Sequence, residues 1–390
     1  MLAGHASALK RRPMTPTFKA MFDLQKFVMS ATLILLGCST LVAQASSDSL
    51  DIERLNREIG QMLMVGMRGS DVDNEDMDQI MSQIQQGEIG GIILFKHNIR
   101  NRKQIKKLLD DLNQLSPRQP LFLAADEEGG LVRRLRKKQG FTEFPSAAYV
   151  GKNMQPAKAY DVYGKLARQM SSTGLNLNLG PVVDVNVNGN SPAIGKLKRS
   201  FSTDPQSVTA FSRSFIKAHR DAGVLTALKH YPGHGSSKED THNDLTDITE
   251  TWDSSEAVPF KELIQSNHVD MIMAGHLFDR NLDPNYPASI SRVHIQENLR
   301  DNLGFSGVVI TDDLQMGAII KRYSLEEIII AAINSGSDIL QFSDPQDLDE
   351  NLPARMREVV IKAIRDGRID VNRIHESYDR IISLKQRISG

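Results

Sequence analysis

The stretch VLTALKHYPGHG, residues 224–235, shows the pattern of an apolar run and a turn on which the prediction of the fold depends. It begins with a short apolar run, and a proline and two glycines near its end force an irregular turn. Lys229 and His230 stand between the run and the turn. Because a buried strand of a parallel sheet reads as a near-continuous apolar segment, the stretch predicts a strand that leads into a loop with polar side chains.

Seven similar apolar runs lie elsewhere in the chain, and helical patterns separate most of the eight. The runs are residues 61–66, 91–95, 121–125, 175–183, 224–228, 271–274, 308–310 and 339–342. The helical patterns are residues 101–115, 156–173, 205–222, 254–265, 324–334 and 351–365. Strands and helices that alternate in this way predict an α/β fold, a single (β/α)8 TIM-type barrel. The alternative is an open doubly wound sheet, which more often shows a Gly-rich phosphate loop after an early strand; this sequence has none.

Composition is that of an ordinary globular protein, with 40% hydrophobic and 24% charged residues among 390. The 47 basic and 48 acidic residues nearly balance, so charge does not favour a nucleic acid or an anionic membrane as partner. From residue 50 onward the composition does not change abruptly and no long linker occurs. Residues 50–390 are therefore predicted to form one catalytic domain.

The first 45 residues have the pattern of a secretory signal peptide. Basic residues from Lys10 to Lys26 precede an apolar run at 27–37, and an Ala-Gln-Ala site ends at Ala45. The apolar run is too short to span a bilayer comfortably. The long basic region leaves Met14 or Met21 as alternative starts, and a buried N-terminal helix is the alternative structure. We expect an exported protein, periplasmic or extracellular.

Cys38 is the only cysteine of the chain, and the Leu-Leu-Gly-Cys that it ends resembles a lipoprotein cleavage box. Apolar sequence continues past it to Val42, which favours cleavage after Ala45 and leaves a lipid anchor on Cys38 as the alternative. The mature protein would then have no cysteine, and its stability would come from its core.

Polar residues stand where five of the predicted strands end, and active sites of such barrels are built from the loops at these ends. Any one of them could be a capping or turn residue, but five together favour an active site. They are Asp126, Asp184, Lys229 with His230, His276, and Asp312 with Asp313.

The loop after the fifth predicted strand continues to Asp240 and His242. An aspartate two residues before a histidine can bond the imidazole and raise its proton affinity, which suits a general acid and base. The Gly/Ser-rich residues 233–237 would let this loop move over the site. The alternative is a zinc ion held by His230, His234 and His242, but their spacing matches no usual zinc signature. We predict no metal and no cofactor.

Two further centres suit chemistry on a sugar. Asp312 could attack an anomeric carbon, or it could cap the following turn. Because Asp313 is adjacent, one of the two aspartates could be catalytic and the other structural. Asp126 could accept hydrogen bonds from two sugar hydroxyls, and Arg134 could reach and order that carboxylate. Arg199 is another candidate for a ligand contact.

These centres, in this order, resemble glycoside hydrolase family 3 and within it the bacterial β-N-acetylhexosaminidases. The most specific piece is K-H-[FYI]-P-G-H-G followed by D-[ST]-H, matched at residues 229–235 and 240–242. In the β-glucosidase branch the acid/base usually lies on a second domain, and fewer than 50 residues follow Phe342 here. The sequence departs from the pattern at Glu127, where Gln is usual, and at Leu131, where Arg is usual.

The resemblance implies an exo-acting, retaining hydrolase that removes terminal β-linked N-acetylglucosamine from peptidoglycan fragments or chitooligosaccharides. It implies Asp312 as nucleophile and His242 as general acid/base with Asp240 as its partner. The residues it implies for sugar binding are Asp126, Arg134, Arg199, Lys229 and His230. The alternatives are a β-glucosidase or a phosphorylase on the same barrel, and a catalytically silent sugar-binding protein.

Overall fold

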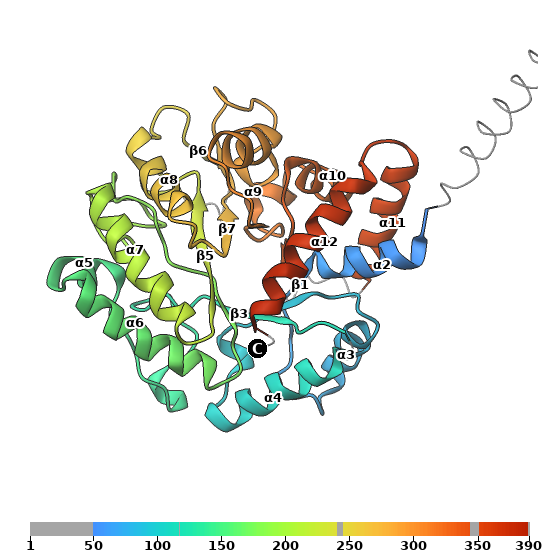
Figure 1. Ribbon diagram of the computed structural model, residues 1–390, viewed down its shortest axis with the longest axis horizontal. Helices are drawn as coiled ribbons and strands as arrows, with labels where there is room; N and C mark the ends of the chain where they lie inside the picture. Colours follow the sequence, from blue (N-terminus) through green and yellow to red (C-terminus); the bar gives the residue numbers. More distant parts are fainter. Residues whose placement is uncertain (1–49, 117, 240–244, 344–350, 389–390) are drawn as a thin grey trace, which may run out of the picture. The chain divides into compact units, whose positions relative to one another are not determined.

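The computed structural model describes residues 50–116, 118–239, 245–343 and 351–388 (Figure 1). Residues Ile52–Gly390 form one compact unit. The predicted signal peptide with Cys38 lies outside the described residues, and so do Asp240 and His242.

Eight parallel strands form one sheet in the order β10-β1-β2-β3-β4-β5-β7-β9. A parallel bridge between Ile310 and Ile339 joins β9 to β10, so the sheet closes on itself. The predicted (β/α)8 barrel is therefore confirmed. The strands are β1 (Leu63–Val65), β2 (Gly91–Ile93), β3 (Phe122–Ala125), β4 (Leu177–Asn178), β5 (Leu225–Tyr231), β7 (Met271–Ala274), β9 (Val308–Thr311) and β10 (Leu340–Phe342).

Each predicted apolar run overlaps one of these strands, and the largest differences in bounds, in the fourth and fifth runs, have physical reasons. The fourth run pairs only at Leu177–Asn178, because Pro181 has no N–H to donate to a ladder; one isolated bridge, from Val182 to Lys229, follows it. The fifth strand continues to Tyr231, three residues beyond its apolar run. Lys229 and His230 thus lie inside the strand and do not follow it.

Helices surround the barrel and cover the outer face of its strands (Figure 1). Local sequence signals set their ends: Ser324 and Glu327 form a capping box at the start of α10, and Gly336 ends it in the left-handed conformation. The helices include α2 (Ile52–Gln61), α3 (Asp78–Gln85), α4 (Arg102–Leu115), α6 (Pro156–Ser171), α7 (Pro205–Arg220), α8 (Ala257–Gln265), α10 (Leu325–Ser335) and α11 (Leu352–Arg365). Several helices of the described residues lie outside the predicted set: α2, α3, α5 (Ala147–Asn153), α9 (Gly317–Ile320), the π-helix η6 (Val293–Asn302) and α12 (Val371–Lys385). No helix of the described part of the chain is both long and apolar enough to cross a membrane.

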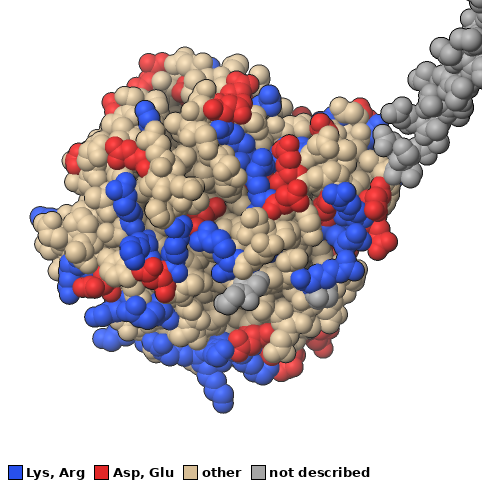
Figure 2. Space-filling view, in the orientation of Figure 1, with Lys and Arg blue, Asp and Glu red and all other residues tan. Residues whose placement is uncertain are grey.

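Helix α12 runs across the barrel in Figure 1 and packs at the amino ends of the strands. The ammonium of Lys385 donates to Gln61 Oε1 and to the carbonyl of Gly90, each at 2.7 Å, and these residues lie just before β1 and β2. Positive and negative side chains are interspersed on the face seen in Figure 2. Helix α12 thus lies at the amino ends of the strands, and the site is predicted at the opposite, carboxyl ends.

Candidate active site

A cavity of about 600 Å³ lies at the carboxyl ends of the strands, where the sequence predicts the site. Six of the eight predicted site residues line it: Asp126, Arg134, Arg199, Lys229, His230 and Asp312. The other two, Asp240 and His242, lie outside the described residues. A larger hollow of about 790 Å³ beside α10 contains none of the eight.

An irregularity in β5 directs two consecutive side chains into the cavity. Leu228 pairs with Ile272 and Tyr231 with Ala274, so Lys229 and His230 together face one residue of β7. In a regular strand, consecutive side chains point to opposite faces. The bulge changes that alternation, and both Lys229 and His230 line the cavity.

Asp126 follows β3 and accepts hydrogen bonds from two cations. Lys229 Nζ lies 2.6 Å from its Oδ1, and Arg134 Nη2 lies 2.7 Å from its Oδ2. The predicted contact between Arg134 and Asp126 is therefore present. Burial alone would raise the pKa of Asp126, but the charges of Lys229 and Arg134 hold it well below its usual value. Asp126 is thus a fixed anionic acceptor at the wall of the cavity.

Glu128, which was not predicted as a site residue, bonds both Arg199 and Lys229. Its two oxygens accept from Arg199 Nε at 2.9 Å and Nη2 at 2.8 Å, and Lys229 Nζ lies 2.7 Å from Oε1. Burial would raise the pKa of Glu128, but Arg199 and Lys229 lower it to about 2. Its sequence signal was the run of three acidic residues directly after an apolar strand. Lys229 therefore bridges two carboxylates, and the array is rigid before any ligand arrives.

Glu127, one of the departures from the family pattern, is buried and supports the loop that carries Arg134. Its Oε2 accepts from the backbone N–H of Arg134 at 2.8 Å and of Leu135 at 3.1 Å. Burial raises the pKa of Glu127 to about 7. A glutamine could make the same two contacts through its carbonyl oxygen, so this departure keeps the architecture.

Asp184, after β4, positions the end of β5. Its Oδ2 lies 2.8 Å from His230 Nδ1, and its Oδ1 accepts from the backbone N–H of His230 at 3.0 Å and of His234 at 2.9 Å. His230 Nε2 in turn lies 3.3 Å from Arg199 Nη2. A carboxylate that bonds Nδ1 fixes the tautomer and orientation of an imidazole, so Asp184 sets how His230 presents itself to the cavity.

The two aspartates after β9 have different surroundings. Asp313 accepts from Ser343 Oγ at 2.5 Å and from the backbone N–H of Gln315 at 3.0 Å, and burial raises its pKa. These contacts join the loops after β9 and β10. Asp312 lines the cavity, and its Oδ1 accepts from the backbone N–H of Asp313 at 2.9 Å. Both aspartates line the cavity, and the carboxylate oxygens of Asp313 bond the loops after β9 and β10, which gives Asp313 a structural role beside Asp312.

Residues 233–237, which the sequence predicts to let the loop move over the site, are buried and hydrogen-bonded in the structure. Glu256 Oε2 accepts from the backbone N–H of Gly235 at 2.6 Å and of Ser236 at 3.3 Å. A Cβ at Gly235 would lie 1.6 Å from the carbonyl oxygen of Val185. Glycine here allows close backbone packing, and burial raises the pKa of Glu256 to about 7.

The zinc alternative requires His230, His234 and His242 to converge, and His242 lies outside the described residues. Within the described ranges, no three His, Cys, Asp or Glu side chains are grouped so that they could hold a metal ion.

Comparisons with known proteins point to one family. Residues 54–384 match the glycosyl hydrolase family 3 N terminal domain. A beta-hexosaminidase of Xylella fastidiosa (strain 9a5c) is 34% identical over 302 residues, which are 75% of this chain and 86% of that protein.

Two solved structures share the fold. The family 3 beta-N-acetylglucosaminidase from Paenibacillus sp. str. FPU-7 has a TM-score of 0.79 and 31% identity, over 86% of this chain and 62% of that one. The beta-N-acetylhexosaminidase from Beutenbergia cavernae DSM 12333 has a TM-score of 0.77 and 26% identity, over 85% of this chain and 98% of that one. This chain thus spans less than two thirds of the Paenibacillus protein. The resemblance carried by the motifs is confirmed: the chain is a glycoside hydrolase that belongs to family 3, in the branch of the bacterial β-N-acetylhexosaminidases.

Proposed function

We propose that this enzyme releases terminal β-linked N-acetylglucosamine from oligosaccharides and retains the configuration of the anomeric carbon. The observation that carries the proposal is the cavity, in which Asp312 is combined with a fixed array of buried donors and acceptors. Sugar hydroxyls both donate and accept hydrogen bonds, and such an array suits them better than it suits an apolar ligand.

In the first half of the proposed reaction, Asp312 attacks the anomeric carbon while His242 gives its proton to the leaving oxygen. The glycosidic C–O bond breaks, and a glycosyl ester forms on Asp312. In the second half, the neutral His242 takes a proton from water, the water oxygen attacks the anomeric carbon, and the ester bond breaks to regenerate the carboxylate. Two inversions at one carbon give net retention.

Asp240 is proposed to hold His242 and raise its proton affinity, so that the imidazole can both give and take a proton near neutral pH. The support for this assignment is the anchored segment 233–237, which borders the cavity and leads along the chain toward Asp240. Lys229, Arg199 and Asp126 are proposed to bind the hydroxyls of the terminal sugar, together with Arg134 and His230.

Peptidoglycan fragments and chitooligosaccharides are the proposed natural substrates, since both end in this sugar. We also propose that the protein is exported, because residues 1–45 have the three-part pattern of a signal peptide. Cell fractionation and N-terminal sequencing test this: a mature chain that begins at Ser46 supports it, a lipid on Cys38 supports the anchored form, and an uncleaved cytoplasmic chain contradicts it.

The central experiment is Asp312→Ala assayed on nitrophenyl β-N-acetylglucosaminide. We expect a loss of at least about 10⁴-fold in kcat, because the covalent route is removed. Asp110→Ala, on the exposed side of α4, is the matched control and should leave activity unchanged. Near-normal activity of Asp312→Ala would reject the nucleophile.

Three further measurements separate the alternatives. The first product seen by NMR should be the β anomer, and the α anomer would exclude retention. A panel of nitrophenyl glycosides should favour the N-acetylglucosaminide over the β-glucoside. Added phosphate should not divert the product to sugar 1-phosphate; if it does, the enzyme is a phosphorylase.

A further inference from the structure

His234 is buried at the wall of the cavity with one ring nitrogen unused. Its side chain lines the cavity, and the residue is only 2% exposed. Among the described residues, nothing bonds its Nε2. A buried polar atom without a partner is unfavourable unless water or a ligand satisfies it, so this nitrogen needs an explanation.

The contacts of Ser237 determine which nitrogen of His234 carries the hydrogen. Ser237 Oγ donates its only hydrogen to the carbonyl oxygen of His234 at 2.8 Å. His234 Nδ1 lies 2.6 Å from the same Oγ, and therefore Nδ1 is the donor in that pair. In a neutral imidazole the other nitrogen is then an acceptor, so Nε2 presents a lone pair.

The ring is neutral at physiological pH. Burial, with His230 beside it at 5.6 Å between ring centroids, lowers the pKa of His234 to about 4. The groups that face it are His230, Asp184 and Arg199, and the positive charge of Arg199 further disfavours a second cation here. His234 is thus a neutral acceptor beside the cations and carboxylates of the cavity.

We propose that His234 binds the terminal sugar directly, with Nε2 accepting a hydrogen bond from a ring hydroxyl. This rests on the proposed function, which places an N-acetylglucosaminyl residue in the cavity. A hydroxyl that accepts from Arg199 or Lys229 still has its own hydrogen to donate, and His234 supplies the acceptor for it. The acetamido N–H can donate but cannot accept from Arg199 or Lys229, so only a ring hydroxyl can bond one of these cations and His234 at the same time.

Two variants separate the two nitrogens of the ring. In His234→Asn, the amide nitrogen can replace Nδ1 and keep the bond to Ser237, but the side chain has no atom at the place of Nε2. In His234→Gln, the longer amide reaches the place of Nε2 and can supply an acceptor oxygen. We expect His234→Asn to lower kcat/KM on the nitrophenyl N-acetylglucosaminide roughly 10- to 100-fold, and His234→Gln to recover most of that loss.

Deoxy substrates identify the hydroxyl. The wild-type enzyme should lose a similar factor on one of the 3-, 4- and 6-deoxy substrates, and on that substrate His234→Asn should cost no more than about threefold further. A purely structural role predicts the same loss for His234→Asn on every substrate and no rescue by glutamine. Either that pattern or a fully active His234→Asn would overturn the proposal.

A measurement on the wild-type enzyme removes dependence on the variants. With ¹⁵N-labelled histidine, the resonance of the unprotonated Nε2 should move upfield when N-acetylglucosamine is added, and an unchanged resonance in the saturated enzyme would overturn the proposal. If wild-type enzyme cleaves the N-acetylglucosaminide, the proposed function stands whatever His234 does. If it neither cleaves nor binds this sugar, both proposals fall.

Discussion

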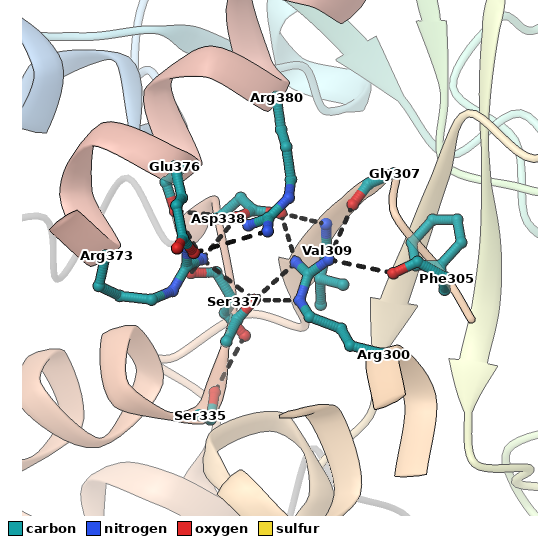
Figure 3. A network of polar contacts seen from close by, with 12 residues as sticks. Arg300, Phe305, Gly307, Val309, Ser335, Ser337, Asp338, Arg373, Glu376 and Arg380 are labelled. Atoms are coloured by element: carbon teal, nitrogen blue, oxygen red, sulfur yellow. Dashed lines mark hydrogen bonds and ion pairs between the residues drawn. The ribbon is translucent and has the colours of Figure 1, made fainter. Parts of the chain in front are cut away.

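The two ends of the barrel bury similar charges, and the cavity that holds the predicted site residues lies at one of them. At the carboxyl ends of the strands, Asp126 accepts from Lys229 and Arg134 at the wall of a cavity of about 600 Å³. At the amino ends, Asp338 lies just before β10 and accepts from three arginines (Figure 3). Those arginines are Arg300, Arg373 and Arg380, at 2.7, 2.6 and 3.1 Å.

Exposure distinguishes the two carboxylates. The side chain of Asp126 is 16% exposed, whereas that of Asp338 is 0% exposed and also accepts from Ser377 Oγ and the backbone N–H of Val309. Burial would raise the pKa of Asp338, but the three guanidinium groups keep it below its usual value. The same chemistry thus orders a binding wall at one end and joins α12 to the barrel at the other, as expected if the carboxyl ends serve catalysis and the amino ends stability.

Helix α12 owes this role to arginines spaced seven residues apart. Arg373 and Arg380 reach Asp338, and Arg387, just past the helix, lies 2.6 Å from buried Asp270 before β7. Residues seven apart share one face of a helix. The helix is therefore bonded to the starts of β10 and β7, which only β9 separates in the closed sheet order.

The largest effect should come from Asp338→Ala. Removal of this carboxylate leaves buried guanidinium groups uncompensated, which should lower the free energy of unfolding by about 3–5 kcal/mol. Urea unfolding measures it, and kcat/KM of the protein that remains folded should stay within twofold of wild type. A loss of less than about 1 kcal/mol would show that the ion pairs of Asp338 with the three arginines do not stabilise the fold.

Asp126→Asn should reduce activity strongly and change the free energy of unfolding only slightly. The variant keeps the shape of the side chain but removes the charge that faces the sugar, so kcat/KM should fall about 10²- to 10³-fold, roughly 3–4 kcal/mol of binding in the transition state. Its free energy of unfolding should change by less than about 1.5 kcal/mol, because Glu128 still balances Lys229. A variant that is unstable but fully active would erase the distinction between the two ends.

Most of the fold could be predicted from the sequence because its strands are buried. Strands covered on both faces appear as apolar runs, and each run overlaps a strand. The bulge at Lys229 and His230 was not readable, because it depends on the register between β5 and β7. Helix α12 was missed as well, since its partners Asp338 and Asp270 come near it only once the barrel closes.

For the site, position along the strands was informative and side-chain direction was not. The six predicted catalytic and sugar-binding residues that the structure describes line one cavity, because strand ends meet at one rim, whereas the strand-end residues Asp184 and His276 do not line it. Glu128 was missed because β3 ends at Ala125, and beyond it no alternation predicts where a side chain points. His234 was considered only as a metal ligand, since its unused nitrogen becomes visible only with Ser237 in place.

Glu256→Gln tests the anchored segment 233–237 through its pH dependence. The pKa of Glu256 is raised from 4.5 to about 7 in the folded protein, so its stabilising contribution is present below pH 4.5 and is lost as pH rises through about 7. Glutamine does not titrate, and therefore the variant should gain up to about 3 kcal/mol relative to wild type between pH 4.5 and 8. Urea unfolding across that range measures the difference, with the exposed Glu358→Gln as control; parallel pH curves for wild type and Glu256→Gln would contradict the assignment.

The smallest effect is expected at the ion pair between Lys106 and Asp110, on the outside of α4. Their Nζ and Oδ2 atoms lie 2.7 Å apart, as close as Arg300 and Asp338, but the side chains are 56% and 45% exposed. A double-mutant cycle with alanine at both positions should give a coupling below about 0.5 kcal/mol, partly because a lysine that precedes its acid on a helix is the weaker order. Salt at 1 M should remove even this, because exposed charges are screened. Since the two distances are equal, a coupling of several kcal/mol here would mean that contact distance and not burial sets the strength of the Asp338 network.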